Sequence, residues 1–134
     1  MSRVRDAMVS DPLALDASAS AQEAGTRLAD PGVRAVLVCD DGALLGVVTR
    51  KTLVREVVAA GKDPATTRLG DVAEPPIFTL DADADLEAAF RELEERDLER
   101  VPVTEDGRRL VGILSRSAVQ RRLAEDEPPV EDVA

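Results

Sequence analysis

The sequence predicts an α/β fold made of two tandem repeats, each a three-stranded sheet with flanking helices, packed with pseudo-two-fold symmetry. The first observation is an internal repeat: Gly46-Val47-Val48-Thr49-Arg50 returns 66 residues later as Gly112-Ile113-Leu114-Ser115-Arg116. The second is an Asp-Gly pair a few residues before each of these five-residue motifs, Asp41-Gly42 and Asp106-Gly107. Because a unit of about 60 residues is marginal alone, two such units are expected to pack against each other.

The repeat divides the chain into four segments. Residues 3–61 form the first copy, residues 62–67 a linker and residues 68–124 the second copy. Residues 125–134 hold five acidic residues and no basic one. That composition predicts a disordered acidic tail.

The first half of the first copy is expected to be a helical turn, a short strand and a helix. Val4–Met8 has the spacing of one amphipathic turn, and the apolar run 13–15 follows a proline, which the start of a strand accepts. Ser20 with Glu23 fits a capping box at the start of the next helix. Pro31-Gly32 is expected to end that helix.

The second half of the first copy is expected to be a hairpin and a closing helix. Apolar runs at 36–38 and 44–48 flank Asp41-Gly42, and an Asp-Gly pair between such runs is a strong hairpin signal. A helix is predicted over residues 50–60, and Gly61 is well placed to end it.

The second copy repeats this order at an offset of 65, and of 66 beyond its turn, which holds one extra residue. A helical turn is expected at 69–73, strands at 77–80 and 101–103, and a closing helix over 116–124. Asp83 and Asp85 are N-cap candidates for the helix between these strands. Its apolar residues recur at helical spacing and predict a buried face: Leu86, Ala89, Phe90 and Leu93.

The charge of the chain argues against nucleic acid and anionic membranes as partners. The formal net charge is −10, from 27 acidic and 17 basic residues, so polyanions are repelled. Two Phe and no Tyr or Trp leave no aromatic platform for stacking single-stranded bases.

The absence of His and the presence of a single Cys exclude many catalytic mechanisms and metal sites. The sequence has no His, which excludes Ser-His-Asp and Cys-His catalysis and His-ligated metals. A single Cys39 allows neither an internal disulfide nor a Cys-x-x-Cys metal site, and we expect it to be a half-buried strand residue. No apolar run is long enough to span a membrane and no signal peptide is recognised. We therefore expect a cytoplasmic protein that is not an enzyme and requires no cofactor.

These motifs resemble those of tandem cystathionine-β-synthase (CBS) domains over about residues 3–124. The second copy matches through Val101-Pro102-Val103, Asp106-Gly107 and Gly112 to Ser115. In the first copy Leu37 stands where the family usually has Pro. The resemblance implies a regulatory module whose copies pair, commonly within a dimer of pairs. It also implies that adenosine-containing ligands such as AMP, ADP, ATP or S-adenosylmethionine bind in clefts between the repeats.

The family's ligand motif is Gly, two apolar residues, Thr or Ser, two further residues, then Asp or Asn. The resemblance implies that the Thr or Ser faces phosphate and that the acid holds the ribose. Both copies depart from it at the last position, which is Thr52 in the first copy and Ala118 in the second. Each Thr or Ser is also an ordinary N-cap candidate, and the Arg that follows it an ordinary solvated charge. The candidate ligand-binding residues are Thr49, Arg50, Thr52, Ser115 and Arg116.

Two functions remain open from the sequence. One is a sensor of adenine nucleotides, favoured by the intact first part of each motif, with the Thr49 and Thr52 site expected to be the better one. The other is a protein-interaction or dimerisation module with degenerate pockets, favoured by the missing acids. In either case we expect a homodimer, because symmetric dimers are the commonest assembly, and an unidentified protein target.

Overall fold

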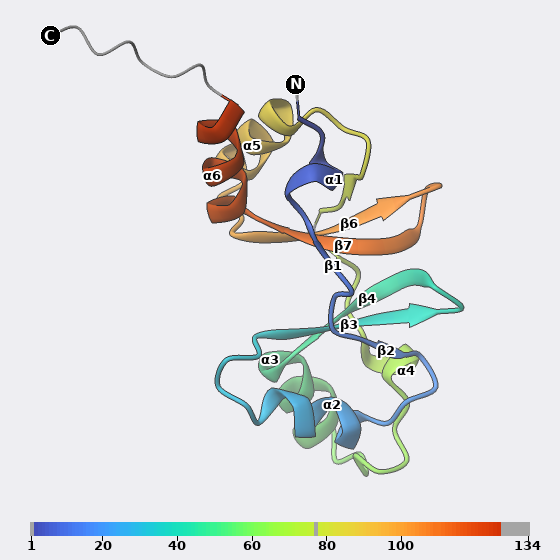
Figure 1. Cartoon of the computed structure of the whole chain (residues 1–134). Helices are drawn as coiled ribbons and strands as arrows, with labels where there is room; N and C mark the ends of the chain where they lie inside the picture. Colours follow the sequence, from blue (N-terminus) through green and yellow to red (C-terminus); the bar gives the residue numbers. More distant parts are fainter. Residues whose placement is uncertain (1, 77, 127–134) are drawn as a thin grey trace, which may run out of the picture. The chain divides into compact units, whose positions relative to one another are not determined.

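The computed structural model describes residues 2–76 and 78–126, which form two compact units. Unit 1 comprises residues 2–11, 78–107 and 111–126, and unit 2 comprises residues 12–76 and 108–110. Both units combine strands and helices, which confirms the predicted α/β class (Figure 1). No helix in the described part of the chain is long and apolar enough to cross a membrane.

In unit 2, three strands pair in the order β2-β3-β4. β2 runs parallel to β3, so the chain crosses over through a helix between them, and β3 and β4 form an antiparallel hairpin. The elements of unit 2 are β2 (Ala14–Asp16), α2 (Ala21–Leu28), β3 (Ala35–Asp40), β4 (Ala43–Thr49), α3 (Arg50–Leu53), the π-helix η1 (Val54–Val58) and α4 (Leu69–Val72).

Unit 1 repeats this plan, with β5 parallel to β6 and β6 beside β7. A further short strand, β1, runs antiparallel to β7. The elements of unit 1 are α1 (Val4–Ala7), β1 (Val9–Ser10), β5 (Leu80–Asp81), α5 (Leu86–Glu95), β6 (Arg100–Glu105), β7 (Arg109–Ser115, of which 111–115 belong to this unit) and α6 (Arg116–Asp126).

Both predicted Asp-Gly turns are present. Asp41 and Gly42 have φ of 51° and 83°, and Asp106 and Gly107 have φ of 50° and 87°. Two consecutive residues with positive φ match the right-handed twist of a hairpin, and Gly accepts this conformation at little cost. The turn of the second copy is one residue longer, because β7 begins at Arg109, two residues after Gly107, whereas β4 begins directly after Gly42.

The closing helix of the first copy differs from the expected single α-helix. It is α-helical for one turn and continues as η1 to Val58, and Gly61 then takes a positive φ of 69°. Three β-branched residues, Val54, Val57 and Val58, fall in this stretch and crowd a regular α-turn. Wider π-turns of this kind are often found at functional sites.

The closing helix of the second copy, α6, continues through Glu125 and Asp126, the first two residues of the predicted tail. Asp126 accepts a hydrogen bond of 2.5 Å from the hydroxyl of Ser2, and Arg122 forms ion pairs with both acids. These contacts tie the end of α6 to the start of the chain within unit 1. Residues 127–134, the rest of the predicted tail, lie outside the described residues.

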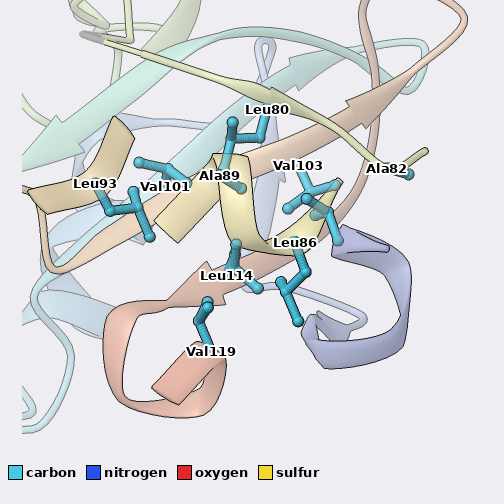
Figure 2. Packing of buried hydrophobic residues seen from close by; sticks show 10 residues of the cluster. Leu80, Ala82, Leu86, Ala89, Leu93, Val101, Val103, Leu114 and Val119 are labelled. Carbon is cyan, nitrogen blue, oxygen red and sulfur yellow. The ribbon is translucent and has the colours of Figure 1, made fainter. Parts of the chain in front are cut away.

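Each unit has its own apolar core, and each core includes a helix from the other copy of the repeat. In unit 1, Val4 of α1 is fully buried with residues of the second copy. Figure 2 shows members of this core from the second copy, among them Leu86, Leu93 and Leu114. In unit 2, Leu69 and Val72 of α4 are buried among residues of the first copy such as Val36 and Val48. The first segment of each copy, residues 2–9 and 67–74, therefore packs on the remainder of the other copy, and we call these two the exchanged segments.

Backbone hydrogen bonds at equivalent positions of the two units also join the first segment of each copy to the other copy. In each unit, two bonds join the exchanged segment to the loop before α5 or α2, and a third joins it to the first residue of that helix. In unit 1 they run from Val4 N to Ala84 O (2.9 Å), Arg5 N to Ala82 O (2.9 Å) and Leu86 N to Ser2 O (3.0 Å). In unit 2 they run from Leu69 N to Ala19 O (2.8 Å), Gly70 N to Ala17 O (2.9 Å) and Ala21 N to Thr67 O (2.8 Å).

Candidate functional site

The hydroxyls of Thr49 and Thr52 form the centre of the candidate site in unit 2. Thr49 is the N-cap of α3, and its Oγ1 accepts a bond of 3.3 Å from the backbone N of Thr52. In return Thr52 Oγ1 accepts from the backbone N of Thr49 at 3.0 Å, and the two hydroxyl oxygens are 3.0 Å apart. Thr52 is only 1% exposed. This reciprocal capping box fixes both side chains.

A carboxylate lies beside this pair of threonines and contacts Thr52. The Oγ1 of Thr52 donates to Oε1 of Glu74 at 3.2 Å, and Arg55 of η1 forms an ion pair with the same oxygen. Glu74 belongs to the second copy of the repeat and reaches unit 2 through the exchanged segment. Its side chain is 47% accessible, whereas Thr52 is buried.

The backbone of Glu74 is held against β4 by a pair of hydrogen bonds. Val47 N donates to Glu74 O at 2.8 Å, and Glu74 N donates to Val47 O at 3.0 Å. The approach depends on Gly46, because a Cβ atom there would lie 2.4 Å from Glu74 O. The glycine of the motif therefore provides the space in which the exchanged segment crosses the strand.

The equivalent place in unit 1 lacks the carboxylate, and Ala118 stands there in place of Thr52. Ser115 Oγ accepts from Ala118 N at 3.2 Å and lies 3.4 Å from Ser117 Oγ. Val9 takes the place of Glu74, pairs with Ile113 of β7 and is 63% exposed. The two copies thus share their backbone arrangement, but only unit 2 contains the Thr–Thr–Glu–Arg network.

Arg50 and Arg116 bind loop carbonyl groups in the structure. Arg50 Nη2 donates to the carbonyls of Asp30 and Val33, each at 2.8 Å. Arg116 donates to Leu98 O from Nε (3.1 Å) and from Nη2 (3.0 Å). In both units the guanidinium therefore satisfies carbonyls of the loop that leads from the central helix into the next strand.

We expect Arg116→Ala to lower the free energy of unfolding by about 1–2 kcal/mol, since charge-assisted bonds to a partly buried carbonyl are lost. Arg116 is 21% exposed, which keeps the effect above that of a surface charge. Arg116→Lys should recover only part of the loss, because an ammonium lacks the planar fork. Urea unfolding would measure both variants. Arg91→Ala, at an exposed position of α5, is the control and should change stability by less than about 0.5 kcal/mol. If Arg91→Ala lost as much stability as Arg116→Ala, the bonds from Arg116 to the loop carbonyl would not stabilise the fold.

Cys39 lies in β3 and is partly exposed, as expected from the sequence. Burial raises the pKa of the Cys39 thiol, and the negative charge of Asp16 adds to the rise. The thiol is therefore protonated at neutral pH and is a weak nucleophile. Within residues 2–76 and 78–126, no three His, Cys, Asp or Glu side chains are grouped to hold a metal ion.

Of the five predicted ligand-binding residues, the structure brings Thr49 and Thr52 into contact, while Ser115 and Arg116 lie in unit 1. Sequence reasoning missed Glu74 and Arg55. The signal for Glu74 was a break in the repeat, where an acid replaces the Val9 of the first copy. This break lies outside the ligand motif, so the motif alone does not point to Glu74.

A family model described as CBS domain matches the chain twice, at residues 4–59 and 69–125. Among curated proteins, Hypoxic response protein 1 of Mycobacterium tuberculosis is 31% identical over 126 residues, which is 93% of this chain and 87% of that protein.

Solved structures with the same fold include Hypoxic Response Protein I with two coordinated zinc ions, at 29% identity and a TM-score of 0.75, covering 91% of this chain and 99% of that one. CBSX2 in complex with AMP is 25% identical with a TM-score of 0.74, covering 96% and 100%. A putative acetoin utilization protein from Vibrio cholerae is 22% identical with a TM-score of 0.78, covering 96% and 99%, and this likeness concerns the fold alone.

Proposed function

The chain belongs to the CBS domain family, with two CBS domains in tandem, and on this basis we propose that it is a regulatory module that binds an adenosine-containing ligand. The observation that carries the proposal is the likeness over 96% of the chain to CBSX2, which was solved with AMP. AMP, ADP, ATP and S-adenosylmethionine are the ligands to test first. The proposed role is regulation of an unidentified protein target, without catalysis.

We assign the better site to unit 2. Its Thr49 and Thr52 hydroxyls are fixed by the capping box, and a carboxylate and a guanidinium stand beside them. The basic side chain of Lys51 is exposed next to them, whereas that of Arg50 is bonded to loop carbonyls. In unit 1, Ala118 offers no polar group at the position of Thr52. Unit 2 therefore has the larger set of polar and charged groups at the ligand motif.

The proposal is tested by thermal shift and calorimetry with AMP, ADP, ATP and S-adenosylmethionine. We expect at least one ligand to bind with a dissociation constant of micromolar or weaker. At a hundredfold excess over the dissociation constant, binding to the folded state adds about 2.7 kcal/mol of stability and raises the melting temperature by several degrees. GMP at the same concentration is the control for non-specific anion effects.

The assignment to unit 2 is tested with a matched pair of variants. Thr49→Val keeps the shape of the side chain and removes the hydroxyl, and it should weaken binding about tenfold, the worth of one hydrogen bond. Ser115→Ala removes the equivalent hydroxyl of unit 1 and should leave this affinity within about twofold. The reverse result would move the site to unit 1.

The alternative function is a protein-interaction or dimerisation module. The specific observation in its favour is that neither copy has an acid at the last position of the ligand motif, where Thr52 and Ala118 stand. If no adenosine-containing ligand raises the melting temperature or gives heat on binding, this alternative replaces the sensor.

We also propose that the protein is a homodimer. Val54 and Val58 of η1 are 58% and 72% exposed, and apolar side chains of this size at a helix surface favour association. Val57, in contrast, is covered within unit 2, at 3% exposure. Light scattering after size exclusion should give twice 14.3 kDa at tens of micromolar; a single mass of 14.3 kDa would contradict the dimer.

A further inference from the structure

We propose that Glu74 is the group that binds the ribose hydroxyls of the ligand, and that Thr52 and Arg55 hold its carboxylate in position. This inference rests on the proposed function, because it concerns the same site in unit 2. It assigns the ribose contact to a residue of the exchanged segment, outside the family's motif. It also gives Thr52 a positioning role in place of a binding role.

Burial separates the roles of Thr52 and Glu74. Thr52 is 1% exposed, and its hydroxyl already contacts the backbone N of Thr49, the hydroxyl of Thr49 and Oε1 of Glu74. A ligand cannot reach that hydroxyl without breaking the capping box. The Glu74 side chain, in contrast, is 47% accessible to solvent. Of the two side chains, Glu74 is the one that a ligand can contact.

The carboxylate is fixed at one oxygen. Thr52 and Arg55 both donate to Oε1 of Glu74, and these are its two polar side-chain contacts among the described residues. The lone pairs of Oε2 are then available to a ligand. Because the backbone of Glu74 is also bonded to Val47 in both directions, the group is held at both ends. A fixed acceptor loses little conformational entropy when it binds.

The chemistry of this acceptor matches a sugar better than a phosphate. An ionised carboxylate only accepts hydrogen bonds, and two adjacent hydroxyls can donate to it. Such charge-assisted bonds are about twice as strong as neutral ones. A phosphate would be repelled by the same group. The ligand's ribose, rather than its phosphate, is therefore expected to lie against Glu74.

Unit 1 provides the internal comparison. Val9 occupies the position of Glu74 and pairs with Ile113 as Glu74 pairs with Val47, but it has no acceptor in its side chain. Ala118 occupies the position of Thr52. Discrimination for the ribose hydroxyls is therefore expected to be a property of unit 2 alone.

The test measures the affinities of AMP and of 2′,3′-dideoxy-AMP by calorimetry, for the wild type, Glu74→Gln and a control. We expect the wild type to bind AMP about ten- to a hundredfold more tightly than the dideoxy analogue, the range for bonds to a charged group. In Glu74→Gln this ratio should fall to within about threefold, because the acceptor loses its charge. Thr52→Val should lower the ratio in the same direction.

Glu56→Gln is the matched control. Glu56 is also an acid paired with Arg55, its side chain is 44% accessible, and its removal changes the net charge equally. It should keep the wild-type ratio. Two results would show that Glu74 does not hold the ribose while the nucleotide-binding function still stands. One is that Glu74→Gln keeps the wild-type ratio of AMP to dideoxy-AMP affinity. The other is that the wild type binds AMP and the dideoxy analogue equally tightly. If the wild type binds neither ligand, the proposed function fails and the assignment fails with it.

Discussion

Gly46→Ala is expected to lower the free energy of unfolding by about 3 kcal/mol, since added atoms in a closely packed place force the backbone to shift. The new Cβ would lie 2.4 Å from Glu74 O and 3.1 Å from the Cβ of Ala73. The nearest atom belongs to backbone that is itself hydrogen-bonded to Val47, so it cannot turn away as a flexible side chain can. Urea unfolding followed by circular dichroism would measure the loss.

Two other glycines serve as graded controls. Gly112→Ala should have a smaller effect, because the backbone atom nearest to its Cβ, Val9 O, would lie at 2.8 Å rather than 2.4 Å. The other near atom, Met8 Sδ at 2.8 Å, belongs to a flexible side chain that can move. Gly25→Ala should stabilise the protein by about 0.5–1 kcal/mol, because Gly25 is inside α2 and Ala is the better helix former. Its Cβ would meet its nearest neighbour, in Leu53, at an ordinary 3.8 Å. Equal effects at Gly46 and Gly25 would contradict the crossing described for unit 2.

Local features of the fold could be predicted from the sequence because a few neighbouring residues determine them. Ser20 caps α2 by accepting from Glu23 N at 3.1 Å, and Asp85 caps α5 by accepting from Ala88 N at 3.0 Å. Both Asp-Gly turns have the positive φ angles that a tight hairpin requires. In each case the partner lies within a few residues, so the sequence pattern is sufficient.

The exchange of the first segments could not be predicted in this way. Val4 and Leu69 have the same pattern around them, and either helical turn could pack on its own copy or on the other. The choice depends on which loop carbonyls accept the bonds of the segment, such as Ala84 O for Val4 N and Ala19 O for Leu69 N. These contacts join residues far apart in the sequence, and no local propensity encodes them.

In the candidate site too, contacts between near neighbours in the sequence were predictable, and contacts between distant residues were not. The spacing of Thr49 and Thr52 by three residues at the start of a helix implies a capping contact, and the structure has it. Glu74 could not be placed beside them, because it reaches unit 2 only through the exchange. The carbonyl contacts of Arg50 and Arg116 depend on the course of the loops after α2 and α5, which the sequence pattern does not specify.

This exchange links the fold to the proposed mechanism. The segment that carries Glu74 also carries Leu69 and Val72, which are buried in the core of unit 2. Burial of a Leu side chain contributes about 2–3 kcal/mol, so α4 is held firmly in that unit. The position of the carboxylate is therefore set by core packing as well as by its own hydrogen bonds.

Leu69→Ala is expected to destabilise the protein by about 2–5 kcal/mol, the range for truncating a buried leucine. Leu69 has no exposed surface and lies in the core of unit 2, although its position in the sequence belongs to the second copy of the repeat. Hydrogen exchange read by mass spectrometry should therefore show the largest loss of protection in α2, β3 and β4, because amides exchange faster where local stability falls.

Leu86→Ala is the matched variant, since Leu86 is also fully buried, but in the core of unit 1. It should cost a similar free energy of unfolding and reduce protection mainly in α5, β6 and α6. The two variants lie in the same copy of the repeat, so a fold without exchange would place both effects in the same elements. If Leu69→Ala instead accelerates exchange in α5 and β6 more than in α2 and β3, α4 does not belong to unit 2. Glu74 would then lose the packing that holds it beside Thr52.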